Sequence, residues 1–248
     1  MYTTFKNILT RLIPRKLLFR QEEKLRKIYG VFYGGNNFQC NICLKNLKKF
    51  IPTSNGDLLC PNCGSLQRNR RLWQLLETEF LKPGQNILDF SPSRCLYRKL
   101  KKTSDSQYQS TDLSGDFIAD HAFDITHLES PDRSYDLILC YHILEHIPDD
   151  HKAMSELFRV MKSGAQALVQ TPFKDGEIYE DLSIVSEKDR LVHFGQEDHV
   201  RIYSIVGLKE RLEIAGFLVD VRENFQDENN FGLNPDEKLL VVTKPLNL

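Results

Sequence analysis

The chain has 248 residues, 41% of them hydrophobic, and a formal net charge of −1. This length is enough for one large domain plus a small module, and the near-neutral balance excludes a protein that binds nucleic acid through its overall charge. No stretch approaches the ~20 consecutive apolar residues of a membrane-spanning helix.

Residues 1–28 form a basic segment with eight Lys and Arg against two Glu. Five apolar side chains fall on one helical face of it: Phe5, Ile8, Leu9, Leu12 and Ile13. This pattern suits a helix that lies on a membrane surface, and it equally suits a tail that covers an apolar edge of a domain. Arg11 and Arg15 interrupt the apolar run and exclude a secretory signal. We therefore expect a cytoplasmic protein, with peripheral contact at the inner face of the membrane through residues 1–20 as one alternative.

Residues 29–82 hold two Cys-x2-Cys pairs separated by sixteen residues: Cys40, Cys43, Cys60 and Cys63. Cytoplasmic thiols stay reduced, and two such pairs can bring four thiolates into the tetrahedron that Zn2+ accepts. The letters SNGDLL between the pairs indicate a hairpin turn, and Gly64 relieves the backbone after the last ligand. We predict a zinc ribbon whose ion is structural, because four protein ligands leave no position for a substrate.

The letters SLQRNRRLWQLLETEFL predict a helix that Ser65 caps. Trp73, Leu76 and Phe80 form an apolar stripe on this helix, which indicates a surface that docks the module on the larger domain. The helix also carries three arginines: Arg68, Arg70 and Arg71. They suit either an anionic ligand such as RNA or a solvated helical face.

Strand-like and helix-like segments alternate from residue 83 to residue 248. The strand-like segments are 85–90, 108–112, 135–142, 165–172, 217–223 and 238–244, and the helical ones are 94–102, 148–164 and 204–216. This alternation predicts an α/β domain with a doubly wound, mostly parallel sheet and helices on both faces. Ligands of such sheets bind at the carboxyl ends of the strands, near the switch in strand order.

The letters CYHILEHIPDD at residues 140–150 have two interpretations. His142-x-x-Glu145-His146 matches the pattern that inverted zinc peptidases place on a helix, but the same letters can end a strand at the rim of a cofactor pocket. Pro148 disfavours helical geometry at the residue before it, and no suitably placed third ligand is evident downstream, although His193 and His199 remain. We interpret the string as the end of a strand.

From about Gly84 to Lys244 the chain resembles the class I S-adenosylmethionine-dependent methyltransferases. The letters YDLILCYHILEHIPDDHKAMSELFRVMKSGAQALVQTPF are similar to that family's fourth strand, the helix behind it and the fifth strand. The resemblance implies a Rossmann-like sheet of seven strands, the last of them antiparallel, a role that KLLVVTK fits. It also implies S-adenosylmethionine as the cofactor.

The resemblance also implies cofactor-binding residues. Asp89 would approach the amino-acid part of the cofactor, and Asp112, 23 residues later, would accept hydrogen bonds from both ribose hydroxyls, with Leu113 beside it. Asp124 would read the adenine amino group. Three further residues would line the pocket: Ile125 against the adenine ring, and Tyr141 and His142 beside the sulfonium.

The first loop departs from the family pattern. The family has D-x-G-x-G, whereas this chain has DFSPSRC, with Ser91, Pro92 and Ser93 and without glycine. Since glycine is what makes turns with positive φ inexpensive, either the loop takes another route and contributes Ser91 or Ser93 hydroxyls, or cofactor binding has weakened or been lost. A non-catalytic interaction protein on a degenerate scaffold is therefore an alternative.

Residues 173–204 form an insert that is too long for an ordinary connection and predicts a lid or binding loop. Its letters HFGQEDHVRIY resemble a segment in methyltransferases of bacterial surface-glycan gene clusters. We expect His199, then His146, to accept the proton of the acceptor, with Glu145 positioning it. The expected substrate-binding residues are His193, Asp198, Arg201 and Tyr203.

The resulting hypothesis is a methyltransferase that acts on a small-molecule or glycan-type acceptor, which could be lipid-linked, in bacterial surface polysaccharide biosynthesis. The alternative is an rRNA or tRNA base methyltransferase, because some ribosomal-RNA guanine methyltransferases also join a four-ligand zinc module to this fold. The acidic balance of the residues after position 28, −7, argues against RNA.

Overall fold

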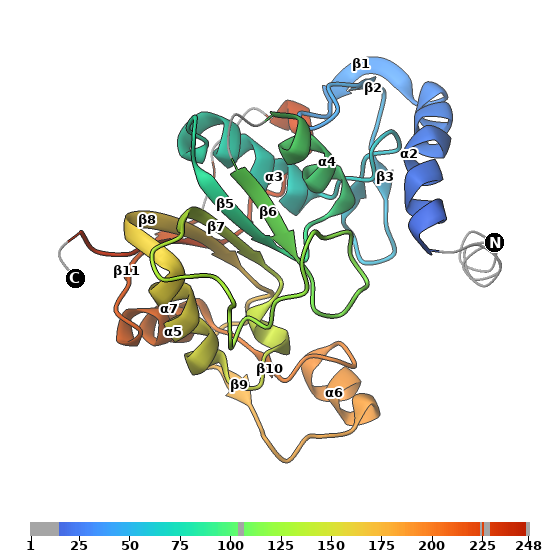
Figure 1. The fold of residues 1–248 in the computed structure, drawn as a ribbon. Coiled ribbons are helices and arrows are strands. Elements are labelled where there is room, and N and C mark those ends of the chain that lie inside the picture. Colours follow the sequence, from blue (N-terminus) through green and yellow to red (C-terminus); the bar gives the residue numbers. More distant parts are fainter. Residues whose placement is uncertain (1–14, 104–106, 224, 226–228, 247–248) are drawn as a thin grey trace. The chain divides into compact units, whose positions relative to one another are not determined.

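The computed structural model describes residues 15–103, 107–223, 225 and 229–246, with the backbone alone at 15–20 and 229 (Figure 1). The chain forms two compact units: Met1–Thr78 with Asp227–Asn234, and Glu79–Gln226 with Pro235–Leu248. None of the described helices is both long enough and apolar enough to cross a membrane. The apolar residues 5–13 of the basic segment lie outside the described residues, so the membrane-surface hypothesis stays a prediction.

The first unit contains a long helix, two small hairpins and a second helix. Helix α2 (Arg15–Val31) precedes β1 (Gly34–Gln39), β2 (Asn46–Leu47), β3 (Ile51–Pro52) and β4 (Leu58–Leu59), and α3 (Gln67–Leu75) follows. Strands β1 and β2 pair antiparallel, as do β3 and β4. The turn between β3 and β4 has Gly56 at φ 83°, which confirms the hairpin predicted from SNGDLL. A π-helical turn, η1 (Leu76–Phe80), continues α3, and η3 (Asn229–Phe231) completes the unit.

The second unit is built on a sheet that, within the described residues, has six strands in the order β11-β12-β8-β7-β5-β6 (Figure 1). These are β5 (Asn86–Phe90), β6 (Gln107–Thr111), β7 (Tyr135–Tyr141), β8 (Met161–Gln170), β11 (Leu218–Arg222) and β12 (Leu239–Thr243). Strands β6, β5, β7 and β8 are parallel, and β12 runs antiparallel to both of its neighbours. Beside β6, a single parallel bridge joins Thr111 to His121. This bridge lies where a seventh strand would continue the sheet.

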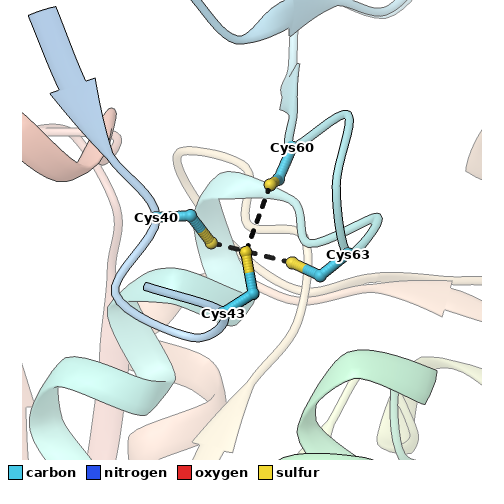
Figure 2. A group of neighbouring side chains, drawn as sticks. All are labelled: Cys40, Cys43, Cys60 and Cys63. Carbon is cyan, nitrogen blue, oxygen red and sulfur yellow. Dashed lines mark hydrogen bonds between the residues drawn. The ribbon is translucent and has the colours of Figure 1, made fainter. Parts of the chain in front are cut away.

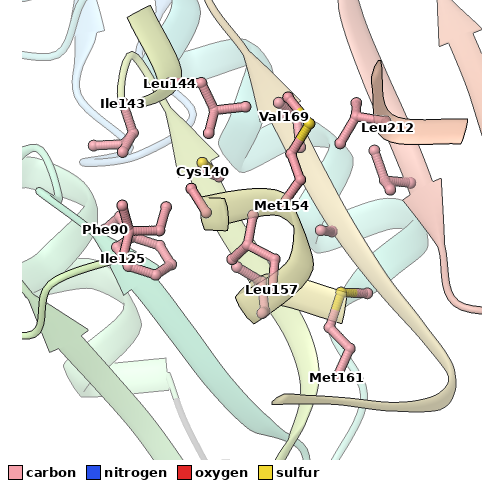
Figure 3. Close-up of a cluster of buried hydrophobic side chains, with 14 of the residues drawn as sticks. Phe90, Ile125, Cys140, Ile143, Leu144, Met154, Leu157, Met161, Val169 and Leu212 are labelled. Atoms are coloured by element: carbon pink, nitrogen blue, oxygen red, sulfur yellow. The ribbon is translucent and has the colours of Figure 1, made fainter. Parts of the chain in front are cut away.

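Among the described residues, the second unit also contains the helices α4 (Arg94–Thr103), α5 (Asp150–Val160), α6 (Glu187–Phe194) and α7 (Ile205–Ile214), of which α6 belongs to the insert. Met154 and Leu157 of α5 and Leu212 of α7 pack in one apolar cluster with Cys140 of β7 and Val169 of β8 (Figure 3). Burial of these side chains at ~25 cal/mol per Å² is the main stabilising contribution. It fixes the strand ends that carry the polar residues described below.

The helix predicted at 148–164 is shorter than expected. Asp149 caps α5 by accepting a hydrogen bond from the Lys152 amide, and the helix ends at Val160, so the prediction that it stops at Gly164 is wrong. Strand β8 begins directly at Met161, and a bulge shifts its register against β7 before Gln166. Glycine at position 164 serves this bulge with φ 77°.

The order of the strands places the switch point between β5 and β7. The chain passes from β5 to β6 on one side of β5 and then crosses to β7 on its other side. Ligands of doubly wound sheets bind beyond the carboxyl ends of the strands at such a point. The ends of β5 at Phe90 and of β7 at Tyr141 therefore define where a cofactor site is expected.

Candidate active site and zinc centre

The four cysteines of the ribbon converge on one point (Figure 2). The Sγ atoms of Cys40 and Cys63 are 3.6 Å apart, and those of Cys43 and Cys60 are 3.9 Å apart. Four thiolates bound to Zn2+ at ~2.3 Å in a tetrahedron have sulfur atoms ~3.8 Å apart. The set fits a structural zinc ion and offers it no open position.

Both cysteine pairs lie in the same kind of turn. In the first, the Leu44 amide donates to the Cys40 carbonyl at 2.7 Å, and in the second the Gly64 amide donates to the Cys60 carbonyl at 2.9 Å. The residue after each pair has a positive φ, 58° at Leu44 and 79° at Gly64. The role predicted for Gly64 is thus confirmed, and Leu44 adopts the same conformation without being glycine.

The arginines that follow the ribbon are structural. Arg70 is fully buried and donates to the carbonyl oxygens of Ser65, Leu58, Phe231 and Gly232 at 2.7–3.0 Å. Its guanidinium also stacks on the Phe50 ring at 4.0 Å. The hypothesis of an anion-binding or solvated arginine face is therefore wrong for Arg70, because every part of this cation is enclosed by its own unit.

Two further details of this helix differ from the sequence analysis. Arg71 is also buried, which leaves Arg68, half-buried and ion-paired to Asp57 at 3.8 Å, as the most accessible of the three. Ser65 does not cap α3: the Asn69 side chain accepts from the Leu66 amide instead. The Ser65 hydroxyl lies 3.3–3.4 Å from the Cys40 and Cys63 sulfurs and thus supports the cysteine cluster. The docking role of the apolar stripe stays a prediction.

The glycine-free loop after β5 keeps a left-handed turn. Ser91, at the first glycine position of the family pattern, has φ 44°. Its amide donates to the Thr111 carbonyl at 2.7 Å, and its hydroxyl donates to Asp112 Oδ1 at 2.8 Å. A non-glycine residue in this conformation costs roughly 1–2 kcal/mol, and such strain is concentrated at functional sites. The Ser91 hydroxyl thus binds a carboxylate of the chain itself, and its contact with the cofactor stays a prediction.

Asp112 directly follows β6 and is buried. Its two oxygens accept hydrogen bonds from the hydroxyls of Ser91 and Ser114 and from the Phe117 amide, at 2.8–3.2 Å. Hydroxyl groups of the chain thus lie where ribose hydroxyls are predicted to bind. Leu113, the next residue, is exposed.

The two residues predicted to contact adenine, Asp124 and Ile125, differ in how far they are buried. Asp124 is exposed, and Oδ1 of its carboxylate accepts from the amide and hydroxyl of Thr126 at 2.8 Å, which lowers the pKa of Asp124. Ile125 is buried in the apolar cluster with Phe90 (Figure 3). Contact of either residue with adenine stays a prediction.

Asp89 is a buried carboxyl at the end of β5. Its Oδ2 accepts a hydrogen bond from the Tyr108 hydroxyl at 2.8 Å. Burial raises the pKa of Asp89 to about 7, although the Tyr108 hydrogen bond opposes this. A group poised to ionise near neutrality beside a switch point fits a partner for a cationic ligand such as an ammonium group.

This pKa gives a pH-dependent stability. The folded-state pKa of Asp89, about 7, lies above its ordinary value of 3.8, so between these values the folded state holds a proton that the unfolded state has lost. The Asp89 contribution to the free energy of unfolding therefore falls as pH rises through this window, by about 4 kcal/mol over the whole window. Denaturant unfolding at pH 5 and pH 8 should show the part of this loss that falls between those pH values, about 2.5 kcal/mol, in the wild type and not in Asp89→Asn. Equal pH dependences would contradict the assignment.

The end of β7 is also strained and holds polar groups without partners. Tyr141 is the last residue of the strand, and His142 has φ 57°. Among described residues, His142 Nε2, Gln170 Oε1 and Thr171 Oγ1 are buried and lack a hydrogen-bond partner. Gln170 and Thr171 are not among the site residues predicted from the sequence. The signal that could have found them is a pair of polar residues directly after an apolar strand. Such orphaned groups at adjacent strand ends fit the polar parts of a cofactor.

The H-x-x-E-H string does not form an α-helix. His142 follows β7, and Leu144–His146 is a short 3-10 turn, η2. The interpretation of the string as a strand end is therefore confirmed. His142 Nδ1 donates to Glu145 Oε1 at 3.1 Å. Burial opposes ionisation of Glu145, but this bond and the nearby His142 and His146 outweigh it, so the pKa of Glu145 lies below its usual range.

The insert brings His199 to this turn. Its strands β9 (Tyr179–Glu180) and β10 (Arg201–Ile202) pair antiparallel, with α6 between them. The rings of His146 and His199 meet edge to face with centroids 4.6 Å apart. Burial and the neighbouring His146 lower the pKa of His199, which favours the neutral imidazole that a proton acceptor needs. An oxygen of the exposed Asp198 carboxylate lies 3.1 Å from His146 Nδ1.

Arg201 and Tyr203 hold the insert in place, and their assignment to the substrate is corrected. Both side chains are buried. Arg201 donates to the carbonyl oxygens of Leu144, Ile147 and Pro148 and to Glu180. The Tyr203 hydroxyl donates to a buried carboxylate of α5, that of Asp150. With their donors occupied in this way, neither side chain is available to an acceptor. His193 lies apart from this network, on α6, and pairs with the Tyr179 hydroxyl at 2.6 Å.

Comparison with known proteins identifies the family. A family model described as a methyltransferase domain matches residues 65–220, which is more than half of the chain, so the chain belongs to that family. A probable S-adenosylmethionine-dependent methyltransferase of Mycolicibacterium smegmatis is 30% identical over 96 residues, which are 39% of this chain and 34% of that protein. The chain thus spans about a third of the length of this curated relative.

Solved structures show the same fold at low identity. The [4+2]-cyclase SpnF matches with a TM-score of 0.54 at 15% identity, over 94% of this chain and 96% of that one. Phosphoethanolamine N-methyltransferase 2 of Haemonchus contortus, solved with S-adenosylmethionine, matches with a TM-score of 0.50 at 17% identity, over 71% and 52%. A methyltransferase of Archaeoglobus fulgidus also scores 0.50, at 18% identity over 71% and 91%. The fold is the Rossmann-like fold of class I methyltransferases.

Proposed function

We propose that this protein transfers a methyl group from S-adenosylmethionine to a hydroxyl of a small-molecule or glycan-type acceptor in bacterial surface polysaccharide biosynthesis. The observation that carries the proposal is the gathering of buried polar groups at the carboxyl ends of β5 to β8. Asp89, Asp112, His142 and Gln170 come from four neighbouring strand ends around the switch point. S-adenosylmethionine is a polar methyl donor with an ammonium group, a ribose and a sulfonium. It suits the carboxyl-terminal edge of this sheet.

S-adenosylmethionine supplies a methyl carbon on a cationic sulfur. In the transfer the carbon–sulfur bond breaks, a carbon–oxygen bond forms, and sulfur keeps the electron pair as a neutral thioether. The hydroxyl proton passes to Nε2 of His199 or His146. Alignment of the reacting atoms contributes up to ~7–11 kcal/mol, and a positioned base contributes ~10²–10⁴-fold. Glu145, bonded to His142 at the end of β7, would position the acceptor between the strand ends and the insert.

A membrane-associated acceptor has support from helix α2. This helix continues the basic segment and exposes Leu25, Ile28 and Tyr29 at helical spacing. An apolar stripe with cations beside it suits peripheral contact with an anionic membrane. We therefore include lipid-linked saccharides among the proposed acceptors, with a cytoplasmic protein at the inner face of the membrane.

The RNA alternative loses its main support. Its cations were the arginines after the ribbon, and Arg70 and Arg71 are buried in their own unit. RNA binding needs several exposed cations and weakens steeply with salt. The third arginine, Arg68, is half-buried and paired with Asp57.

The test is a transfer assay with the full chain, methyl-labelled S-adenosylmethionine and a panel of saccharides, nucleotide sugars, lipid-linked saccharides and RNA. We expect label in a saccharide-containing acceptor, and a loss of ~10²–10⁴-fold in kcat for His199→Gln with unchanged S-adenosylmethionine affinity. Label in RNA alone would establish the base methyltransferase instead. Cofactor binding without transfer to any acceptor would favour the non-catalytic alternative.

A further inference from the structure

Glu145, His146 and His199 form a second cluster of ligand-type side chains, separate from the cysteines. One ligand atom of each lies within 4.8 Å of those of the other two. Glu145 and His146 belong to the η2 turn, and His199 belongs to the insert just before β10. A carboxylate and two imidazoles from two segments thus share one small volume.

The hydrogen bond of His199 fixes which of its ring nitrogens is free to bind. His199 Nδ1 lies 3.2 Å from the Phe194 carbonyl oxygen, which can only accept, so Nδ1 carries the hydrogen and Nε2 keeps its lone pair. Metal-binding histidines characteristically donate their other nitrogen to a carboxylate or backbone carbonyl, and the His199 bond is of this kind. His146 Nδ1 lies 3.1 Å from an oxygen of the exposed Asp198 carboxylate, which places an acidic group beside this second ring.

Two of the converging atoms are buried acceptors without a donor. Glu145 Oε2 and His199 Nε2 lack a hydrogen-bond partner in the described part of the chain. Their residues are only 1% and 4% exposed. Leaving a buried polar group unpaired costs ~1–3 kcal/mol, and more where the group is charged. Because both atoms offer electron pairs, a bound cation satisfies them together.

We propose that Glu145, His146 and His199 bind a divalent transition-metal cation such as Zn2+ or Mn2+. Imidazole nitrogen favours such ions over Mg2+ and Ca2+, which prefer sites made of oxygen atoms. Three protein ligands leave at least one coordination position open, as in catalytic zinc sites. The His146 side chain is 28% exposed, so this position can be reached from solvent. The cysteine site, with four protein ligands, is closed by comparison.

The backbone around the cluster holds the ligands in place before a metal arrives. The Val200 amide donates to the Glu145 carbonyl at 2.9 Å. Arg201, the second residue after His199, donates to the Leu144 and Pro148 carbonyls at 3.0 and 2.8 Å. The two segments that supply the ligands are thus bound to each other on both sides of the cluster. Little ordering entropy remains to oppose metal binding.

Metal binding itself does not depend on the proposed function, whereas its role in the reaction rests on that function. A cation at this cluster would bind an acceptor hydroxyl through its oxygen and lower the pKa of that hydroxyl. With its Nε2 bound to the metal, His199 would no longer accept the proton, which would pass from the coordinated hydroxyl to solvent water. The cluster borders His142 at the end of β7 through the Glu145 bond, so the acceptor would be oriented towards the cofactor edge.

The test is a titration of the full chain, already loaded with one zinc ion, with Co2+ and then with Mn2+. About one further equivalent of Co2+ should bind per chain. Its spectrum should show weak d–d absorption and should lack the intense near-ultraviolet band that thiolate ligands give at a cysteine site. Glu145→Gln and His199→Gln should each weaken this second equivalent by about 10-fold or more. His146→Ala is a further variant that does not threaten the fold, because this side chain is partly exposed. His151→Gln, an exposed histidine of α5, is the matched control and should bind as the wild type does.

The outcomes separate the two proposals because no step uses S-adenosylmethionine or an acceptor. Absence of a second equivalent in the wild type, or its full retention in His146→Ala and His199→Gln, would overturn the metal site. Retention of the first equivalent of zinc at the cysteine site reports on folding in every variant. A metal bound as proposed in a protein that transfers no methyl group would uphold this inference and contradict the proposed function.

Discussion

Asp112→Ala is expected to reduce the affinity for S-adenosylmethionine by ~100-fold or more. Two hydrogen bonds from ribose hydroxyls to a charged carboxylate are worth ~1.5–3 kcal/mol each, and the variant removes both. In the structure the Ser91 and Ser114 hydroxyls occupy this carboxylate, so ribose must displace or share them. Isothermal titration calorimetry with S-adenosylmethionine and S-adenosylhomocysteine measures the loss.

Two variants of the same loop make this result specific. Ser114→Ala removes a competing hydroxyl and should bind the cofactor as tightly as the wild type or more tightly. Asp116→Ala removes an exposed carboxylate from the same loop and should leave the affinity within about two-fold. Unchanged affinity in Asp112→Ala, or an equal loss in Asp116→Ala, would refute the ribose assignment.

Removal of the metal from the cysteine site is the second change with a large expected effect. Structural zinc contributes ~10–16 kcal/mol to the folding of small zinc modules, more than their apolar core supplies. Cys60→Ser should therefore lose about one zinc ion per chain. Amide hydrogen exchange should then become fast at Leu44 and Gly64, whose amides close the two turns.

Cys95→Ser is the matched control for this experiment. Cys95 is buried in α4, outside the tetrahedron. This variant should retain zinc and the slow exchange of the ribbon amides. If Cys60→Ser keeps full zinc content, or if chelation leaves exchange at Leu44 unchanged, the ion is not what stabilises the ribbon.

The elements of the larger unit could be predicted because local pattern and tertiary structure agree there. The apolar run 135–141 is a central strand, buried on both sides, and KLLVVTK is antiparallel to both neighbours as expected. The end of α5 could not be placed, because the register shift of β8 against β7 is a property of the sheet and not of the letters MKSG. No separate apolar segment of the sequence corresponds to a seventh strand. At that edge of the sheet the structure has a single bridge between Thr111 and His121.

Buried cations account for most of the errors in the predicted sites. From the sequence, Arg70 suits either an anionic ligand or a solvated helical face, and Arg201 is assigned to the substrate, because arginine is usually exposed. Each is instead surrounded by backbone carbonyl oxygens that lie far away in sequence, such as Gly232 for Arg70 and Leu144 for Arg201. Nothing in a single sequence shows which carbonyls lack an amide partner, so this use of arginine could not be foreseen.

The H-x-x-E-H string shows how a motif can mislead about geometry and still mark ligands. The helix that would join His142 and His146 to one metal is replaced by a strand end and a 3-10 turn. The fold brings His199 to Glu145 and His146 instead. Sequence spacing could supply the residue types but not the partner, because His199 arrives through tertiary structure.

Fold alone does not decide the reaction of this protein. SpnF, a structure with the same fold, is named a cyclase, and folds host several activities. What distinguishes this chain is its own set of polar groups at the strand ends, including Asp89 with its raised pKa and the serine at the first glycine position.

A crystal structure of the full chain with S-adenosylhomocysteine tests the central claim most directly. The account predicts the nucleoside beyond the carboxyl ends of β5 and β7, with its ribose hydroxyls on Asp112 and its amino group near Asp89. Saturating ligand with no density at these strand ends, or density at another place in the molecule, would contradict it.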